Sequence, residues 1–407
     1  MKPEDHRAHA RTPAARAVLP MAALQPTPVH ALASLMGMTP AQLQALLAKV
    51  HGQGDLAGIC LQMYYVFLLH NQTQAALDMQ TRALRQQRLY RLVGSPAPKL
   101  RLLVLMGPGH MQDNTPIEFV LDGSDVQTEL LFLLPGEPLP NVLPLHDVVF
   151  VAIGESDRNA ALLAQLQASL PLWPRPFVNQ PAAIAHGARD RCYQLLKDLP
   201  GVRVPQTLRL LAVEAPGLAY PLTLRPVDTQ GGEGLQRIAC VEDLAAYFAA
   251  TPASAYYAAE FVDYQSEDGQ YRKCRIVLID GQPFICHLAI SDHWMVHYLS
   301  AGMADSAAKR LEEQQCMQGF GQGFGLRHRA ALAAIANALQ LDYVTLDCTE
   351  TRDGQLLVFE VDSRGLIHAA DPVEVYPYKP AVMQKTFDAF RALLQKRAGL
   401  VTLPRVS

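Results

Sequence analysis

The most informative stretch of the chain is Thr345–Ser363, which reads TLDCTETRDGQLLVFEVDS. Two apolar, β-prone runs flank a turn at Asp353-Gly354, and this pattern predicts an antiparallel hairpin. Glu360 and Asp362 are two residues apart and therefore share one face of their strand, with Asp347 roughly opposite Glu360. Three converging carboxylates repel one another unless a hard cation lies between them. We therefore predict a Mg²⁺ site at Asp347, Glu360 and Asp362; the alternative is solvated acids on an exposed edge.

A glycine-rich turn is the second informative feature. It reads DTQGGEG over Asp228–Gly234, and Gly231, Gly232 and Gly234 would let backbone N–H groups approach phosphate oxygens closely. The run LTLRPV stands directly before it and carries Arg225, which would reach the same phosphates from the adjoining strand. An ordinary hairpin loop is the alternative, but its place beside Arg225 favours a loop that covers a nucleotide.

The remaining patterns divide the chain into four parts. Residues 1–30 are rich in Pro, Arg and Ala without a clear period, which predicts a flexible tail. Three helical patterns follow, the last ending at Gly94, with the spacing of a tetratricopeptide-like hairpin; they form either a structural cap or a peptide-recognition surface. The buried runs RLLVLMG, TELLFLLPG and HDVVFVAIG then predict a parallel sheet. A helix over 181–199 leads into strands that alternate with helices. The predicted domains are 1–30 (tail), 31–96 (helical module), 97–175 (α/β) and 176–400 (α+β).

Composition excludes several classes of protein. Half of the 407 residues are hydrophobic and 18% are charged, which suits a globular chain of several domains. The formal net charge of −3 offers no basic field for nucleic acid. We find no run long and apolar enough for a membrane span and no secretory signal pattern. Seven scattered cysteines without a C-x-x-C pair are typical of a reduced, cytoplasmic compartment.

Taken in order over residues 175–397, these motifs resemble the ATP-grasp superfamily, in particular the branch of D-alanine:D-alanine ligases, glutathione synthetases and ribosomal-protein-S6-modifying ligases. The resemblance implies an ATP-grasp fold, in which two α+β subdomains clasp ATP. A small α/β pre-ATP-grasp domain and the N-terminal helical module would precede it. It implies ATP and Mg²⁺ as cofactors. The fold class we predict is therefore α+β.

The resemblance also assigns residues to roles. The two nucleotide-binding cations fall on Arg191 and Arg225, where the family usually has Lys; the exchange keeps the charge but replaces a compact ammonium by a planar fork. The adenine-binding hinge falls on Glu260, Phe261 and Val262. For the reacting groups and metal, it implies catalytic roles for Arg225, Arg275 and Arg364, and metal ligands at Asp347, Glu360 and Asp362.

Two departures from the family pattern concern charge. Asp362 stands where the family usually has Asn, and Lys273 stands where the S6-modifying branch has an acid. The stretch HLAISDHWMVHYLSAGM, which begins at His287, lies between the hinge and the metal hairpin and is predicted to line the acceptor site rather than to bind zinc. Its candidates are His287, His293, Trp294, His297 and Tyr298. Arg364, Gly365 and His368, which follow the metal strand, are predicted either to contact the substrate carboxylate or to be plain loop residues.

The implied activity is that of an ATP-dependent carboxylate–amine ligase. A carboxylate is a poor electrophile, and transfer of the ATP γ-phosphoryl group to it makes an acyl phosphate whose leaving group is phosphate. The partners would be a small-molecule carboxylate and an amine. Two alternatives stay open: an enzyme that modifies a peptide, and a catalytically silent nucleotide-binding module. Ligases of the resembled branch are commonly homodimers, so a homodimer is one possible state of this chain.

Overall fold

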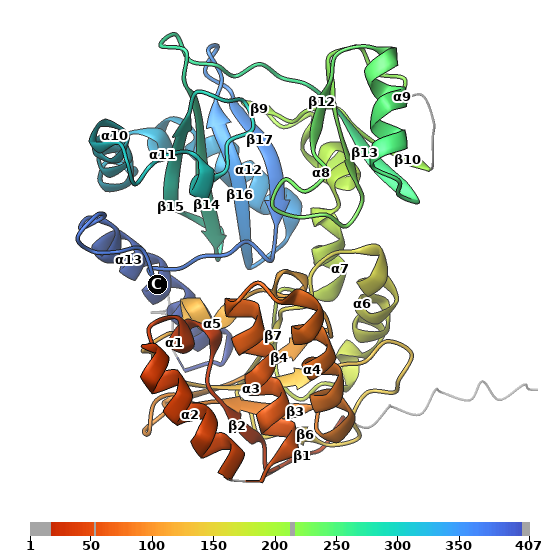
Figure 1. The fold of residues 1–407 in the computed structure, drawn as a ribbon, viewed down its shortest axis with the longest axis vertical. Helices are drawn as coiled ribbons and strands as arrows, with labels where there is room; N and C mark the ends of the chain where they lie inside the picture. The colour runs from red at the N-terminus through yellow and green to blue at the C-terminus, as the bar shows by residue number, and fades with distance from the viewer. Residues whose placement is uncertain (1–17, 53, 212–215, 401–407) are drawn as a thin grey trace, which may run out of the picture.

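The computed structural model describes residues 18–52, 54–211 and 216–400. Figure 1 shows a lower body, which holds the N-terminal part of the chain, and two lobes that stand side by side above it. The smaller lobe is drawn in green and the larger in teal and blue. The α+β fold class predicted from the sequence is confirmed. Residues 1–17 of the predicted tail lie outside the described residues.

The body is built on a six-stranded sheet. The strands of the body are β1 (Met21–Ala22), β2 (Thr27–Val29), β3 (Leu89–Leu92), β4 (Leu100–Met106), β5 (Val126–Phe132), β6 (Leu143–Pro144), β7 (Val148–Val151) and β8 (Phe177–Val178). The sheet order is β2-β3-β5-β4-β7-β8, and β1 pairs separately with β6. Strands β5, β4, β7 and β8 are parallel, as the apolar runs predict, because continuous apolar strands suit a sheet covered on both faces.

Two predictions about the N-terminal region are wrong. Strands β1 and β2 lie within the part predicted as a tail, and β3 lies within the part predicted as the end of a helix. Strand β3 has an apolar run short enough to be either helix or strand, and its pairing with β2 and β5 settles the choice. The tetratricopeptide-like repeat is not confirmed.

The helices of the body cover this sheet. They are α1 (Leu32–Met36), α2 (Pro40–Gly52), α3 (Leu56–Leu69), α4 (Thr73–Gln86), α5 (Ile117–Val120), α6 (Asp157–Ser169) and α7 (Pro181–Ile184). Asp55 caps α3 by accepting a hydrogen bond from the Gly58 N–H (3.2 Å). Helices α3 and α4 also hold the loop after β4, since Tyr64 Oη and Gln80 Nε2 both donate to the Gly109 carbonyl at 3.0 Å. These helices therefore position a loop that reaches the cavity described below.

The small lobe has its own core. Its strands are β10 (Thr207–Leu211), β11 (Leu222–Pro226), β12 (Gln236–Ile238) and β13 (Ala255–Glu260), in the antiparallel order β10-β13-β11-β12, with α9 (Val241–Ala250) packed against them. Its buried apolar side chains form a cluster separate from that of the rest of the molecule. The lobe is therefore tied to the molecule mainly by contacts at its edges.

The large lobe carries the predicted hairpin. Its strands are β9 (Val202–Arg203), β14 (Tyr271–Ile279), β15 (Gln282–Ser291), β16 (Tyr343–Glu350) and β17 (Leu356–Asp362), in the order β15-β14-β16-β17-β9. Its helices are α10 (Ala307–Gln318), α11 (Phe324–Arg327) and α12 (Arg329–Leu339). The turns at Asp280-Gly281 (φ 50° and 77°) and at Gly354 (φ 80°) join β14 to β15 and β16 to β17. The hairpin predicted at Asp353-Gly354 is confirmed, and β14 and β15 form a second one.

The helix predicted over 181–199 is broken. Helix α7 is followed by a single 3₁₀ turn, Ala185–Gly187, and Ala188 is extended (ψ 131°) before α8 (Arg189–Leu196) begins. The break turns α8 away from α7, so that its first residue lies at the cavity between the lobes. The break therefore decides which arginine of α8 faces the cavity.

The body and the large lobe share one core. Phe150 on β7, Tyr343 on β16 and Phe390 on the C-terminal helix α13 (Lys379–Arg397) pack edge to face, with ring centroids 5.2 to 6.0 Å apart, and all three are fully buried. This packing fixes the hairpin relative to the body. None of the helices in the described ranges combines the length and apolarity that crossing a bilayer requires.

Candidate active site

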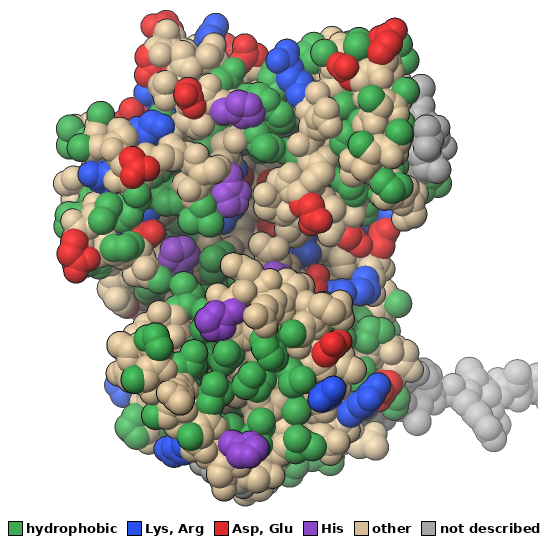
Figure 2. Space-filling model, viewed as in Figure 1, with side chains coloured by type: hydrophobic (Ala, Val, Ile, Leu, Met, Phe, Trp, Pro, Cys, Tyr) green, Lys and Arg blue, Asp and Glu red, His purple; other side chains and the backbone are tan. Residues whose placement is uncertain are grey.

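A cavity of about 670 Å³ lies where the two lobes meet the body. In Figure 2 it opens as a hollow near the centre of the molecule, with several histidine side chains around it. Its walls come from β11, β13 and the glycine-rich turn on one side and from β14, β16 and β17 on the other. Met111, Gln112 and Pro116 of the body close its floor. Three parts of the fold therefore contribute to one site.

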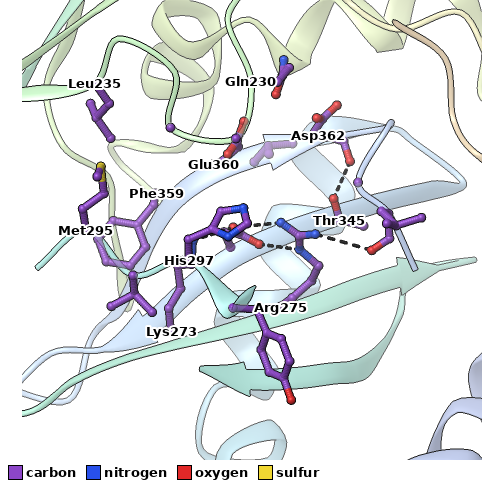
Figure 3. Close-up of a pocket in the computed structure, with 18 of the residues that line it drawn as sticks. Gln230, Leu235, Lys273, Arg275, Met295, His297, Thr345, Phe359, Glu360 and Asp362 are labelled. Carbon is purple, nitrogen blue, oxygen red and sulfur yellow. Dashed lines mark hydrogen bonds and ion pairs between the residues drawn. The ribbon is translucent and has the colours of Figure 1, made fainter. Parts of the chain in front are cut away.

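Asp347 lies at the centre of the charged part of this cavity. Strand register places it directly opposite both Arg275 on β14 and Glu360 on β17. Arg275 Nε and Nη2 donate to its two oxygens at 2.8 and 3.1 Å, and Lys273 Nζ lies 3.0 Å from Oδ2. Figure 3 shows Lys273, Arg275 and Glu360 around the same space. Burial alone would raise the pKa of Asp347, but Arg275 and Lys273 hold it well below its usual range.

The other two acids of the hairpin also have cationic partners. Arg189 donates to Glu360 Oε1 at 2.5 Å, and Arg364 Nε donates to Asp362 Oδ1 at 3.0 Å. Asp362 Oδ1 also accepts the Arg364 backbone N–H at 2.8 Å. All of these side chains are at least two-thirds buried. The site therefore contains three carboxylates and four facing cations: Arg189, Lys273, Arg275 and Arg364.

The three acids lie on one strand pair as predicted, and each of them faces a cation. Within the described residues, no three His, Cys, Asp or Glu side chains are arranged to hold a metal ion. Both oxygens of Asp347 are engaged by cations, whereas Glu360 Oε2 and Asp362 Oδ2 have no hydrogen-bond partner among these residues. Mg²⁺ is commonly held by only one or two carboxylates together with substrate phosphates. Glu360 and Asp362 fit such an ion, and Asp347 does not.

Arg225 and the glycine-rich turn face the cavity together. The buried Arg225 donates through Nη2 to the Thr229 carbonyl (2.5 Å) and to Thr229 Oγ1 (3.0 Å), which ties the strand to the turn. Burial, helped by the nearby Arg189, lowers the pKa of Arg225 to about 10. Gly231 (φ 60°) and Gly232 (φ 82°) line the cavity, but Gly234 does not. An added Cβ on Gly234 would lie 2.7 Å from the ring of Pro226, so that glycine is needed for packing.

The predicted hinge lines the same cavity. Glu260 pairs with Arg203 at 2.7 Å in an exposed position. The Phe261 ring lies under the Arg237 guanidinium (4.4 Å) and edge-on to Trp294. In the described part of the chain, the Val262 N–H and the Phe261 carbonyl have no hydrogen-bond partner. Such free backbone groups can recognise the edge of a base.

Arg191, which the resemblance assigns as the first nucleotide cation, does not line this cavity. Arg191 lines a separate shallow surface hollow beside Asp190 and Arg209. Because the break at Ala188 sets the phase of α8, its first residue, Arg189, faces the cavity instead. The sequence HGARDRC contains both arginines, and only the position of the break decides between them.

The far end of the cavity contains a polar network that sequence reasoning missed. The fully buried Glu313 accepts from Tyr298 Oη (2.9 Å) and Tyr378 Oη (2.6 Å), and Lys379 Nζ lies 3.0 Å from Asp371 and 3.5 Å from Glu313. Apart from Tyr298, no local motif marks these residues, since α10, the 298 loop and the start of α13 are brought together only by folding. Of the predicted acceptor-site residues, all line the cavity except His293.

No family model matches the chain, and no curated protein matches it. Among solved structures it is similar to a D-alanine–D-alanine ligase from Bacillus anthracis in complex with ATP, at 14% identity over 75% of this chain and all of the other, with a TM-score of 0.43. It is also similar to the VanG D-Ala:D-Ser ligase from Enterococcus faecalis (14% identity, 72% and 99% covered, TM-score 0.45). A RimK domain ATP-grasp protein from Sphaerobacter thermophilus gives 16% identity, 72% and 99% covered, and a TM-score of 0.40.

The architecture of the chain itself carries the fold assignment. Two α+β lobes enclose one cavity, a glycine-rich turn and a carboxylate hairpin face each other across it, and an α/β body closes the floor. The predicted arrangement of two α+β lobes preceded by an α/β domain is confirmed.

Proposed function

We propose that the chain is an ATP-dependent ligase that activates a carboxylate as an acyl phosphate and transfers it to an amine. The observation that supports this is the row of four cations and three carboxylates on the walls of one cavity, opposite a glycine-rich turn. Phosphoryl transfer requires positioning and charge neutralisation far more than covalent chemistry from the protein. A nucleotide is the ligand that uses all of these features.

In this proposal the small lobe binds the nucleotide. Backbone groups of Phe261 and Val262 bind the base, and Arg225 with the N–H groups of Gly231 and Gly232 binds the phosphates. Mg²⁺ would be held by Glu360 and Asp362 and would neutralise phosphate charge as the γ-phosphoryl group transfers.

The large lobe orients the reacting groups. The substrate carboxylate oxygen attacks the γ-phosphorus, a new O–P bond forms, and the β–γ bridging bond breaks to release ADP. Arg275 and Arg364 neutralise the charge that develops on the transferred group. The amine then attacks the carbonyl carbon and phosphate leaves.

The amine must lose a proton in this second step. His287 lines the cavity with its ring 4.5 Å from that of Tyr298, and burial lowers its pKa well below the usual range. The lowered pKa keeps the imidazole neutral but makes it a weak base, so we assign His287 to accept a hydrogen bond from the amine and orient it for attack, while the departing phosphate can carry the proton away.

The test is turnover with defined pools of substrates. Purified protein is incubated with Mg·ATP and pools of amino acids and short peptides, and phosphate release is measured together with the masses of the products. Pool-dependent phosphate release with a dehydrated conjugate, lost in Glu360→Gln, is expected. Glu137→Gln is the matched control, since it breaks an exposed Glu–Arg pair far from the cavity. Nucleotide binding without turnover on any pool, peptides included, would instead indicate a silent module.

A further inference from the structure

The number of metal ions that the site holds depends on Asp347. Its side chain is only 6% exposed, and both of its oxygens are committed: Oδ1 to Arg275 at 2.8 Å, and Oδ2 to Lys273 at 3.0 Å. A carboxylate that coordinates a metal must direct an oxygen lone pair at the ion. A metal at Asp347 would therefore lie against two buried cations that already neutralise this carboxylate, and their positive charge would oppose its binding.

Lys273 is placed to be a permanent partner of this carboxylate. It lies on β14 two residues before Arg275, so both side chains leave the same face of the strand. Because Arg275 is directly opposite Asp347, Lys273 lies on the diagonal, within reach of a long side chain. It is 18% exposed and lines the cavity. Its ammonium group is a compact point charge, the kind that most resembles a small metal ion.

The charge balance of the site also favours a single divalent ion. Four cationic side chains face three carboxylates, so the walls already carry excess positive charge toward a nucleotide triphosphate. Only Glu360 and Asp362 keep an oxygen without a partner in the described residues. One divalent ion suits this arrangement. A second ion would add positive charge near Asp347, where Lys273 and Arg275 already supply it.

We propose that Lys273 takes the place of a metal ion at Asp347, so that the chain binds one divalent cation per nucleotide, through Glu360 and Asp362. The inference rests on the proposed function, because the nucleotide completes the coordination of that ion. It gives Lys273 a specific role, which is to occupy the position of a second metal ion. General neutralisation of phosphate charge would not require this role.

The experiment counts Mn²⁺ ions bound per bound β,γ-imido analogue of ATP, by equilibrium dialysis with electron paramagnetic resonance. Wild-type protein is expected to bind one Mn²⁺ per analogue. Lys273→Met removes one of the two cations on Asp347 Oδ2 and leaves there only the Arg275 hydrogen bond at 3.1 Å, and a second Mn²⁺ is expected to appear. Lys385→Met, which changes an exposed lysine on α13, is the matched control and should leave the count at one.

The outcomes separate this inference from the proposed function. Two Mn²⁺ per analogue in the wild-type protein would overturn the inference alone, and this measurement needs no variant to fold. A Lys273→Met protein that binds the analogue more weakly with an unchanged count would also overturn it, because Lys273 would then be a phosphate ligand. Failure of the wild-type protein to bind the analogue would overturn the proposed function, and the inference with it.

Discussion

Replacing Asp347 by Asn tests the charged centre of the site. At 2.8 Å and an effective dielectric constant of about 20, one ion pair is worth about 6 kcal/mol before desolvation is subtracted. Removing one partner of a buried pair costs about 3–5 kcal/mol, because the remaining charge is left uncompensated. Here two cations, Arg275 and Lys273, would be left. We expect Asp347→Asn to lower the free energy of unfolding by an amount in this range at neutral pH.

The expected loss depends on pH. Burial alone would raise the pKa of Asp347, but its two cations lower it well below the usual range, so the folded value lies below the unfolded value of about 3.9. The stabilisation is therefore complete above about pH 4 and is lost as the pH falls toward the folded pKa. In that window it decreases by about 1.4 kcal/mol per pH unit. The stability gap between wild type and Asp347→Asn should narrow at the same rate.

Thermal unfolding followed by circular dichroism at pH 7.5 and between pH 5 and 3 measures both effects. An unfolding entropy of about 2.1 cal/mol/K per residue over 407 residues gives about 0.85 kcal/mol/K if the chain unfolds as one unit. The variant should then melt about 4–6 °C lower at pH 7.5. Asp122→Asn, at an exposed position, is the control. A loss below about 1 kcal/mol, or a gap that stays constant from pH 5 to 3, would refute the assigned ion pairs.

Three further changes probe other parts of the molecule. Arg225→Met should weaken binding of the ATP analogue about 10- to 100-fold in calorimetry, since a charged hydrogen bond contributes about 1.5–3 kcal/mol. Gly154→Ala places a methyl group 1.8 Å from Cδ of Arg364. A loss of stability of about 1–3 kcal/mol and slower phosphate release are therefore expected. The control is Gly52→Ala, whose methyl group meets no atom within 4 Å and should cause no loss of stability. Phe390→Ala empties the junction between body and large lobe and should cost about 3–5 kcal/mol, seen as a lower melting temperature.

The sequence predicted the hairpin down to its register. The turn at Gly354 and the two-residue repeat of strands together place Asp347 opposite Glu360, and the structure pairs these two residues. Both signals are local, because strand period and turn chemistry depend on neighbouring residues alone. The same reasoning placed Arg225 and the glycine-rich turn correctly at one cavity.

What the sequence could not show is the pairing of charges across the fold. Glu360 and its partner Arg189 are 171 positions apart, and Asp347 and Lys273 come from strands separated by a hairpin and three helices. The resemblance placed the nucleotide cation on Arg191, whereas the break at Ala188 turns Arg189, two residues earlier, toward the cavity. Such pairings are fixed by tertiary packing, which no local pattern records.

The contacts of the small lobe differ in kind from those around Asp347. Its link to the body runs through the start of α6, where the Asp157 N–H donates to Asp228 (3.1 Å) and Arg209 pairs with the half-exposed Asp157 (2.9 Å). Exposed pairs of this type contribute at most about 1 kcal/mol, and the lobe keeps a separate apolar core. These contacts at α6 are weaker than the buried pair of Arg275 and Asp347, which is worth several times more. In the proposed function this lobe binds the nucleotide, and opening it at α6 would break exposed pairs while leaving the charges of the large lobe in place.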